Sequence, residues 1–382
     1  MSGRLARIWV VTELYKPSNT STAHILAQVV EFLSEKFEVY VIAGEAASYK
    51  YGLPELEMKS HDSNIMYLKS PFVRNHILRV IFGFYFSIIV SIKLKRLLQP
   101  DDRILAVTNP QTLLMVMPWF FSSKLTFLIH DVFPDNLVKT SSGLSKYLGK
   151  LLTPFYGFAY KRLSSAIVLG DDMEKVIKEK GVKDVQIIRN WADENIELQP
   201  YPKGKIKILY AGNVGPMQAL KDFLEWFKRL DSELFEFIIK GEGSERAHLQ
   251  EYVKVNKMKN VYFEGAYMRT EQSDILGQAH FCLVSLNESM FGLGVPSKFY
   301  NILKAGRPTL YFGPIGTEIH NCVIKEKVGL VVQSEAKPQA FEKEMFRLIT
   351  ETSPEHYRAF YDNNFSEKQA KTRFLEYFIT ND

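Results

Sequence analysis

The sequence is poor in cysteine, with only Cys282 and Cys322 among 382 residues. Two cysteines cannot build the disulfide framework of a small secreted domain, and Cys282 stands in an apolar, strand-like run that predicts a buried, reduced thiol. The N-terminus also leads directly into a predicted strand at residues 7–13, without the segments of a signal peptide. These features predict a protein of the reducing cytoplasm.

The sequence has little excess charge of either sign. It carries 48 Lys and Arg against 43 Asp and Glu, which gives a formal net charge of +5. A balance this mild suits phosphates or a lipid surface as anionic partners. No zinc-binding spacing and no long basic run favours nucleic acid.

An apolar segment at residues 74–98 is too short to span a bilayer, because its uncharged centre covers only residues 80–92. It is interpreted either as a buried helix or as a helix lying on anionic lipid. In the second case the headgroups would meet the basic residues at its two ends: Arg74, Arg79, Lys93, Lys95 and Arg96. The sequence alone leaves both interpretations open.

Short apolar strands alternate with helical patterns along the chain, which predicts parallel sheets covered by helices on both faces. The strands expected in the first half are residues 8–12, 39–43, 65–68, 104–108, 125–129, 166–169 and 185–188. Those expected in the second half are 206–211, 235–239, 261–263, 281–286, 309–312 and 330–332. Helical patterns include 23–34, 76–98, 145–162 and 172–180. The predicted fold class is α/β, with two doubly wound domains in tandem.

The alternation breaks at residues 190–205, which contain two prolines and a Pro-Lys-Gly turn. We therefore predict an N-terminal domain over residues 1–192, a linker over 193–204 and a C-terminal domain over 205–360. Residues 361–382 are expected to form a C-terminal helix that packs back on the N-terminal domain. Ligands of such folds bind beyond the carboxyl ends of the strands, so a cleft between the two sheets is expected.

Two glycine turns follow successive strands of the second half, at residues 212–215 and 240–243. Glycines let backbone N–H groups approach a phosphate closely, and the start of a following helix adds partial positive charge. The second turn also carries Lys240, which can pair with a diphosphate. Either turn alone is common in ordinary structure, but two in successive strand–helix units favour a diphosphate site.

A third motif is a glycine-rich loop at residues 292–296 that leads into a predicted helix at Ser297. The Ser297 hydroxyl can cap this helix. Lys298 falls in the first turn, where a cation opposes the helix dipole. A residue placed against local preference indicates an anion nearby, and we predict that Ser297 and Lys298 contact the diphosphate.

These motifs resemble the retaining glycosyltransferases of family 4, and most closely their bacterial branch that builds capsule, O-antigen and exopolysaccharide. Their order is Y-A-G-N-x-G, K-G-E-G-S-E-R, N-V-Y-F-E-G and V-P-S-K-F-Y-N-x-x-x-A-G-R-P. The resemblance covers nearly the whole chain and implies the GT-B architecture of two Rossmann-like domains. It also implies a nucleotide-sugar donor, with a UDP-sugar favoured, and a lipid-linked or growing polysaccharide acceptor.

The resemblance implies that the second domain holds most of the donor. The implied donor-binding residues are Gly212, Asn213, Gly215, Lys240, Gly241, Glu242, Gly243, Arg269, Gly294, Pro296, Ser297, Lys298 and Asn301. One feature departs from the family, whose paired glutamates correspond here to Leu293 and Asn301. Asn301 is expected to bond a ribose hydroxyl, and Glu288 to cover the role of the first glutamate.

For catalysis, the resemblance implies His130 and Asp131 beside the donor sugar or acceptor. They follow the apolar strand predicted at residues 125–129. Lys240 and Lys298 would stabilise the leaving diphosphate, which can itself accept the acceptor's proton. Those lysines would make a metal ion redundant, and no Asp-x-Asp triplet is available to hold one. Neither a metal nor another cofactor is therefore expected.

The resemblance also implies an acceptor side near the predicted cleft, formed by Lys16, Ser21, Thr22, Arg189 and Asn190. Ser21 and Thr22 could equally be ordinary helix caps. Two other functions stay open. One is a nucleotide-sugar 2-epimerase of the same fold, and the other is a catalytically silent sugar-nucleotide-binding or scaffold protein that lacks the paired glutamates.

Overall fold

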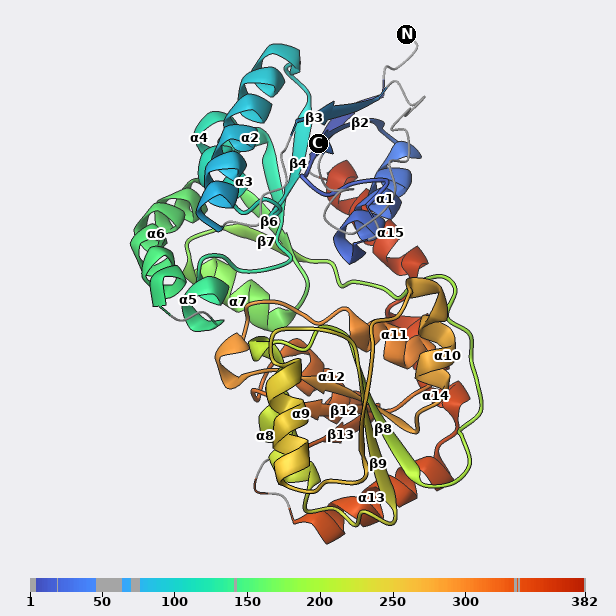
Figure 1. Cartoon of the computed structure of the whole chain (residues 1–382). Helices are drawn as coiled ribbons and strands as arrows, with labels where there is room; N and C mark the ends of the chain where they lie inside the picture. Colours follow the sequence, from blue (N-terminus) through green and yellow to red (C-terminus); the bar gives the residue numbers. More distant parts are fainter. Residues whose placement is uncertain are drawn as a thin grey trace. The chain divides into compact units, whose positions relative to one another are not determined.

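The computed structural model describes residues 5–18, 20–45, 64–69, 76–140, 143–332, 335 and 337–380 (Figure 1). The chain forms two compact units. Unit 1 is Met1–Ile188 with Lys371–Asp382, and unit 2 is Arg189–Ala370. Each unit contains one parallel sheet with its own helices, which confirms the predicted α/β class.

The sheet of unit 1 has the strand order β3-β2-β1-β4-β5-β6-β7, and every neighbouring pair is parallel. Its strands are β1 (Arg7–Val11), β2 (Glu38–Gly44), β3 (Ile65–Leu68), β4 (Arg103–Val107), β5 (Leu125–Leu128), β6 (Ser165–Val168) and β7 (Asp184–Ile187). Each lies within one residue of its predicted bounds. The prediction succeeds because central strands such as β4, buried from residue 104 to 107, are apolar on both faces.

Helices cover both faces of this sheet. They are α1 (Ser21–Ser34), α2 (His76–Leu97), α3 (Thr112–Val116), α4 (Pro118–Phe121), α5 (Asp135–Thr140), α6 (Gly143–Arg162), α7 (Asp171–Glu179) and the end of α15 (Glu367–Thr380). Crossovers between parallel strands are right-handed, so the strand order places α2 to α7 on one face and α1 on the other. Figure 1 shows this division, with α15 beside α1.

The end of α15 is anchored to unit 1 by side chains near the C-terminus. The Tyr377 and Thr126 hydroxyls lie 3.0 Å apart. The Arg103 guanidinium donates to the Phe378 carbonyl, and the Phe378 ring packs edge-on against Phe37 with 6.3 Å between centroids. Residues 371–380 therefore complete the layer that contains α1.

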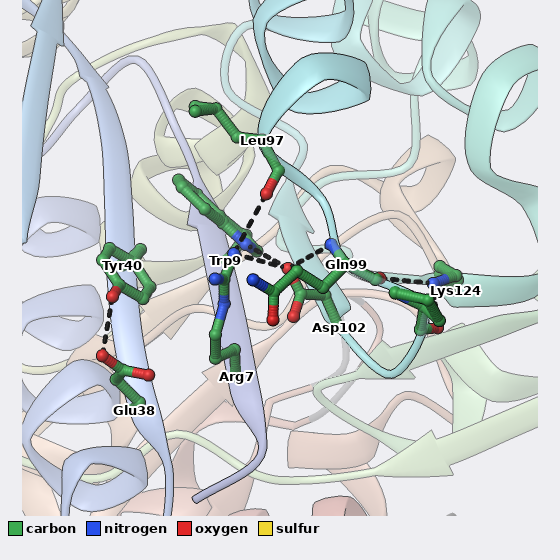
Figure 2. A network of polar contacts seen from close by, with 9 residues as sticks. Arg7, Trp9, Glu38, Tyr40, Leu97, Gln99, Asp102 and Lys124 are labelled. Carbon is green, nitrogen blue, oxygen red and sulfur yellow. Dashed lines mark hydrogen bonds and ion pairs between the residues drawn. The ribbon is translucent and has the colours of Figure 1, made fainter. Parts of the chain in front are cut away.

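A polar network fixes the amino-terminal edge of the same sheet (Figure 2). The buried Asp102 carboxylate accepts hydrogen bonds from Arg7 Nη2 at 2.8 Å, Trp9 Nε1 at 2.9 Å and the Gln99 backbone at 2.9 Å. The Trp9 ring stacks on Tyr40, with centroids 4.7 Å apart. This network ties β1, β2 and the chain that follows α2 together at the edge opposite the strands' carboxyl ends.

The sheet of unit 2 has the order β10-β9-β8-β11-β12-β13, again with parallel neighbours only. Its strands are β8 (Ile206–Ala211), β9 (Phe235–Lys240), β10 (Val261–Glu264), β11 (Phe281–Ser285), β12 (Thr309–Phe312) and β13 (Gly329–Val331). Its helices of four residues or more are α8 (Leu220–Phe227), α9 (Arg246–Val255), α10 (Gln272–Gly277), α11 (Lys298–Lys304), α12 (Glu318–Glu326), α13 (Pro338–Glu351) and α14 (Pro354–Asn364).

The segment predicted as a linker packs on unit 2. Ile196 is buried, and Arg307, which is fully buried, donates hydrogen bonds to the carbonyls of Gln199 at 2.8 Å and Pro200 at 2.9 Å. A buried guanidinium needs such acceptors, and this segment supplies them. The division between the units falls after Ile188, whereas the sequence placed the end of the first domain at residue 192.

In the part of the chain that the structure describes, no helix is both long and apolar enough to cross a membrane. The segment predicted at residues 74–98 forms α2, and Arg74 lies outside the described residues. Within α2, Phe86, Val90 and Leu94 are buried while Ile81 is 54% exposed. The helix is therefore two-sided, and neither interpretation of the sequence describes it completely.

Candidate functional site

The predicted glycine turns lie at the carboxyl ends of β8 and β9 in unit 2, where they pair with each other. The backbone N–H of Gly212 donates to the Lys240 carbonyl at 2.9 Å, and that of Val214 donates to the Glu242 carbonyl at 2.8 Å. Pairing therefore continues beyond the two strands. It holds both turns at one edge of the sheet.

Two of the glycines are required by this pairing itself. A Cβ atom at Gly241 would lie 2.0 Å from the Gly212 carbonyl oxygen, and one at Gly243 would lie 2.0 Å from the Val214 carbonyl oxygen. Real side chains never approach a backbone atom so closely. The predicted diphosphate contact is therefore not needed to explain these two glycines.

Lys298 reaches the first turn from the start of α11. Its Nζ lies 3.8 Å from the centre of the buried Tyr210 ring, and a Cβ atom at Gly212 would come within 2.7 Å of it. The Tyr210 hydroxyl donates to the Asn213 carbonyl at 2.5 Å, which fixes the ring. Among the described residues, no carboxylate pairs with this ammonium group, and the aromatic face is its electrostatic contact.

Burial lowers the pKa of Lys298 from its ordinary value of 10.5 to about 7. The charged form is therefore much less favoured at neutral pH than in an exposed lysine. The nearby Cys282 thiol cannot neutralise it, because burial raises the pKa of that thiol to about 12. A bound anion would restore the full charge, so this position is suited to a phosphate group.

Lys240 is already paired. Its Nζ lies 2.7 Å from a carboxylate oxygen of Glu264, the last residue of β10. Arg246 donates to the carbonyls of Gly241 at 2.6 Å and Glu264 at 2.7 Å, and so clamps the two strand ends together. Of the two predicted diphosphate lysines, Lys298 is thus the one whose charge is not already offset by a carboxylate.

Arg269 and Asn301 converge on Asp193. The Arg269 guanidinium forms an ion pair with the Asp193 carboxylate. The Asp193 backbone N–H donates to Asn301 Oδ1 at 2.9 Å, and Asn301 Nδ2 donates back to the carboxylate at 3.3 Å. Asn301 is 9% exposed. In this arrangement its amide fastens the segment after residue 192, and its expected role toward a ribose stays a prediction.

The loop before α11 places Gly294, Pro296 and Ser297 ahead of Lys298. Ser297 occupies the position before the helix, but its backbone is helical (φ −60°, ψ −23°) and its side chain makes no capping hydrogen bond. The predicted cap is therefore absent. Leu293 is buried at 1% exposure, and Glu288 opens a short 3₁₀ turn whose first N–H groups are met by Asn287.

In unit 1, His130 follows β5, and its backbone N–H donates to the Thr108 hydroxyl at 3.3 Å. Its Nε2 is buried and has no hydrogen-bond partner among the described residues. Burial lowers the pKa of His130 to about 4, so the ring is neutral at physiological pH. The surrounding protein raises the pKa of Asp131 to about 6, although the residue keeps an exposed surface.

The predicted acceptor residues of unit 1 have structural partners. Lys16 Nζ forms an exposed ion pair with Glu31 at 3.0 Å. Thr20 caps α1, since its hydroxyl accepts from the Ala23 backbone at 3.3 Å. Helix α1 begins at Ser21, two residues before the predicted start, so Ser21 and Thr22 lie in its first turn. The capping role belongs to the preceding residue, Thr20.

The predicted pair Arg189 and Asn190 belongs to unit 2. The Arg189 guanidinium donates from Nε and, at 3.2 Å, from Nη2 to the carboxylate of Glu318, the first residue of α12. Asn190 is buried at 5% exposure. Within the described ranges, no group of three or more His, Cys, Asp or Glu residues could hold a metal ion.

No protein-family model matches the sequence. Over 348 residues the chain is 27% identical to the probable glycosyltransferase WbjE of Pseudomonas aeruginosa, with 85% of each protein covered. The solved lipopolysaccharide outer core galactosyltransferase WaaB superposes with a TM-score of 0.66, at 12% identity, over 98% of this chain and 100% of that one. This chain is a GT-B glycosyltransferase.

The fold of this glycosyltransferase is shared with a protein solved with a bound nucleotide. HepE of Anabaena, in complex with UDP, superposes with a TM-score of 0.66 at 11% identity, over 98% of this chain and 100% of that one. At this identity the likeness concerns the fold alone.

Sequence reasoning missed several residues that shape the site of the glycosyltransferase. Tyr210 belongs to the Y-A-G-N-x-G motif, two residues before Gly212. No local sequence pattern predicts that its ring contacts Lys298. Glu264 ends a strand next to β9, so its pairing with Lys240 could be inferred from parallel register. Asp193 falls in the segment predicted as a linker, so its contacts with Arg269 and Asn301 were not expected.

Proposed function

We propose that this glycosyltransferase belongs to family 4 and transfers sugar, with retention of configuration, from a nucleotide-diphosphate sugar. A UDP-sugar is favoured as donor, and a lipid-linked or growing polysaccharide as acceptor in capsule, O-antigen or exopolysaccharide synthesis. The name of WaaB, a lipopolysaccharide outer core galactosyltransferase, supports a role in cell-surface glycan synthesis. The UDP complex of HepE supports the donor.

One observation carries the donor assignment, namely the position of the Lys298 ammonium group beside Gly212 and the Tyr210 ring. A desolvated ammonium group with no carboxylate partner among the described residues costs free energy, and a bound diphosphate would offset that cost. The absent side chain at Gly212 leaves room beside the ammonium group, where a Cβ atom would come within 2.7 Å of it. We assign Ser297, the two glycine turns and Arg269 as the surrounding donor contacts.

In the proposed reaction the bond between the anomeric carbon and the diphosphate breaks as the acceptor hydroxyl attacks the same face of the sugar. The acceptor's proton passes to the leaving diphosphate. Lys298 stabilises the negative charge that develops on this leaving group, with Lys240 in support. We assign His130 and Asp131 to the sugar or the acceptor, because the unpaired Nε2 of the neutral His130 ring can accept a hydrogen bond from a hydroxyl.

The proposal includes neither a metal ion nor another cofactor, since the leaving charge is assigned to lysine. Transfer should therefore continue in excess chelator. We also propose a cytoplasmic location at the inner face of the membrane, where a lipid-linked acceptor would be presented.

Calorimetric titration with UDP tests the donor site, and Lys298→Met is the decisive variant. UDP should bind the native chain and bind the variant at least about tenfold more weakly, as expected for the loss of a charge-assisted contact. Lys254→Met serves as the control, because Lys254 is an exposed lysine of α9 in the same unit. Equal affinities for all three proteins would refute the assignment.

Transfer is tested by incubating the chain with a panel of UDP-sugars and acceptor lipids, then identifying the products by NMR. A glycoside with the donor's anomeric configuration supports the proposal. A UDP-sugar inverted at C2, with UDP still attached, would identify the epimerase. UDP binding with no turnover of any donor would identify a silent binding protein.

A further inference from the structure

The layer formed by α2, α4 and α6 exposes apolar side chains in ordered stripes. On α2 five exposed apolar residues follow each other at intervals of three and four, which places them on one side of the helix. They are Leu78, Ile81, Tyr85, Ile88 and Ile92, each between 43% and 54% exposed. The opposite side of the same helix is buried against unit 1.

A second stripe runs along α6. Tyr147, Leu151, Phe155 and Phe158 are 53% to 65% exposed, whereas Tyr156 and Tyr160 on the other side are buried. The short helix α4 adds the exposed Trp119 and Phe120. Exposed rings and aliphatic chains in this number are unusual on a protein surface that meets only water.

The stripes share one side of unit 1. Helix α3 contacts both α2 and α6, and α4 contacts α6. The crossovers place all four helices on the same face of the sheet, and their buried sides face inward. Their exposed sides therefore point away from the sheet, and Figure 1 shows the helices adjacent along this side.

Charge of one sign accompanies these stripes. Helix α2 contains four basic residues and no acidic one, and so does helix α6. This differs from the near balance of 48 basic and 43 acidic residues in the whole chain. The Arg162 guanidinium lies 4.5 Å from the Trp119 ring centre, which joins the basic and the aromatic parts of the surface.

We propose that this face of α2, α4 and α6 docks on an anionic lipid bilayer. Its apolar stripes would enter the boundary between headgroups and acyl chains, and its lysines and arginines would meet anionic headgroups. Tyr and Trp side chains suit that boundary because each combines an apolar ring with a polar atom. The inference rests on the proposed lipid-linked acceptor for its biological purpose.

A second copy of the chain is a poorer occupant. A symmetric dimer through this face would set the basic residues of α2 and α6 against their own copies, and neither helix supplies a carboxylate to pair with them. Anionic lipid supplies the opposite charge. Screening by salt should accordingly weaken the docking.

Flotation of the full chain with vesicles tests the apolar part. Vesicles of phosphatidylcholine mixed with phosphatidylglycerol should carry the protein upward at low salt, and vesicles of phosphatidylcholine alone should carry far less. The triple variant L151S/F155S/F158S should bind about tenfold more weakly or worse, because three apolar anchors are lost. These side chains are more than half exposed, so an unchanged thermal melt is expected to show that the variant folds.

The control for this variant replaces three equally exposed apolar residues of unit 2. V255S/I315S/I324S removes side chains that are 54% to 69% exposed, and it should float like the native chain. Equal loss in both triple variants would overturn the proposal, because it would show non-specific adsorption. The docking proposal would also be overturned if the native chain floated with neither the anionic nor the neutral vesicles.

The charged part is tested with K146Q/K150Q/K161Q, three exposed lysines of α6. Flotation with anionic vesicles should fall about tenfold or more, whereas the control K254Q/K259Q/K325Q in unit 2 should leave it unchanged. Equal binding of the native chain to neutral and anionic vesicles would contradict the charge complementarity. If the native chain instead formed a dimer that resists salt, and the L151S/F155S/F158S variant were monomeric, the face would be assigned to a second copy of the chain.

UDP titration of the same proteins separates this inference from the proposed function. Native UDP affinity with no flotation would overturn the docking face and leave the donor site standing. Flotation without UDP binding would leave the docking face standing and overturn the donor site.

Discussion

The ammonium group of Lys298 lies 3.8 Å from the centre of the Tyr210 ring, so an aromatic face contacts a partly buried cation. Its burial disfavours the charged form, and its pKa falls to about 7. An ion kept under these conditions is poised for an anionic ligand.

Replacing Lys298 by Met should separate stability from binding. The desolvation cost of the charge in the folded state is fully present below pH 7 and disappears as the pH rises toward the ordinary lysine pKa. Lys298→Met should therefore raise the melting temperature at pH 6 but not at pH 10, while UDP affinity falls at least about tenfold. A lower melting temperature at pH 6 would show that the ammonium group stabilises the fold.

The affinity for UDP should depend on pH through the same group. A bound anion favours the protonated lysine, so affinity should be highest below pH 7 and should decline by up to about tenfold per pH unit above it. Calorimetry in buffers of different ionisation enthalpy should also detect proton uptake on binding near pH 8. Lys298→Met should retain only the pH dependence that belongs to UDP itself.

Arg307 should be a strong determinant of the stability of unit 2. Its side chain is fully buried. The guanidinium donates hydrogen bonds of 2.8 to 3.3 Å to the carbonyls of Leu276, Gln199, Pro200 and Gly277. Each buried acceptor left without a donor costs about 1–3 kcal/mol, so Arg307→Met should lower the free energy of unfolding by about 3 kcal/mol or more. Urea titration measures this change.

The control for that measurement is Arg347→Met, because Arg347 is an exposed arginine of α13 with ion pairs to Glu344 and Glu351. Exposed pairs of this kind contribute at most about 1 kcal/mol. Equal losses in the two variants would show that the buried carbonyls find other donors.

Gly243 should tolerate no side chain. A Cβ atom there would lie 2.0 Å from the Val214 carbonyl oxygen and force the two turns apart. Gly243→Ala should therefore lower both the melting temperature and UDP affinity. Gly157→Ala is a matched control in α6, since nothing lies within 4 Å of the added methyl group there, and it should be neutral or stabilising by up to about 1 kcal/mol.

His130 should act on transfer without acting on the nucleotide. His130→Phe removes the Nε2 acceptor while keeping a ring, so transfer should slow about tenfold or more with UDP affinity unchanged. The neutral ring also makes stability fall as the pH drops from 6.5 toward 4, because the unfolded histidine binds the proton more tightly. The Phe variant should lose that part of the acid sensitivity, measured by thermal melts between pH 4 and 7.

The strands were predictable because their apolar runs are local and buried on both faces. The structural contacts of Asn301 illustrate the limit. Its position in the motif was readable, but the partner that it bonds, Asp193, is 108 residues away. The approach of Lys298 to an aromatic ring depends on side-chain directions that no spacing encodes. The sequence could not decide whether α2 is a buried helix or a helix lying on lipid. In the structure one side of α2 is buried, and the other exposes apolar side chains.

The division of the chain has a consequence for synthesis on the ribosome. Unit 2 is continuous, from Arg189 to Ala370, whereas unit 1 needs the final segment from Lys371 onward. The second unit is thus complete in sequence before the first, although its synthesis begins later. Tyr377 can meet Thr126 only when the segment that begins at Lys371 has been translated and has left the exit tunnel. A nascent chain stalled before that point would carry a finished second unit and a first unit that still lacks its last helix.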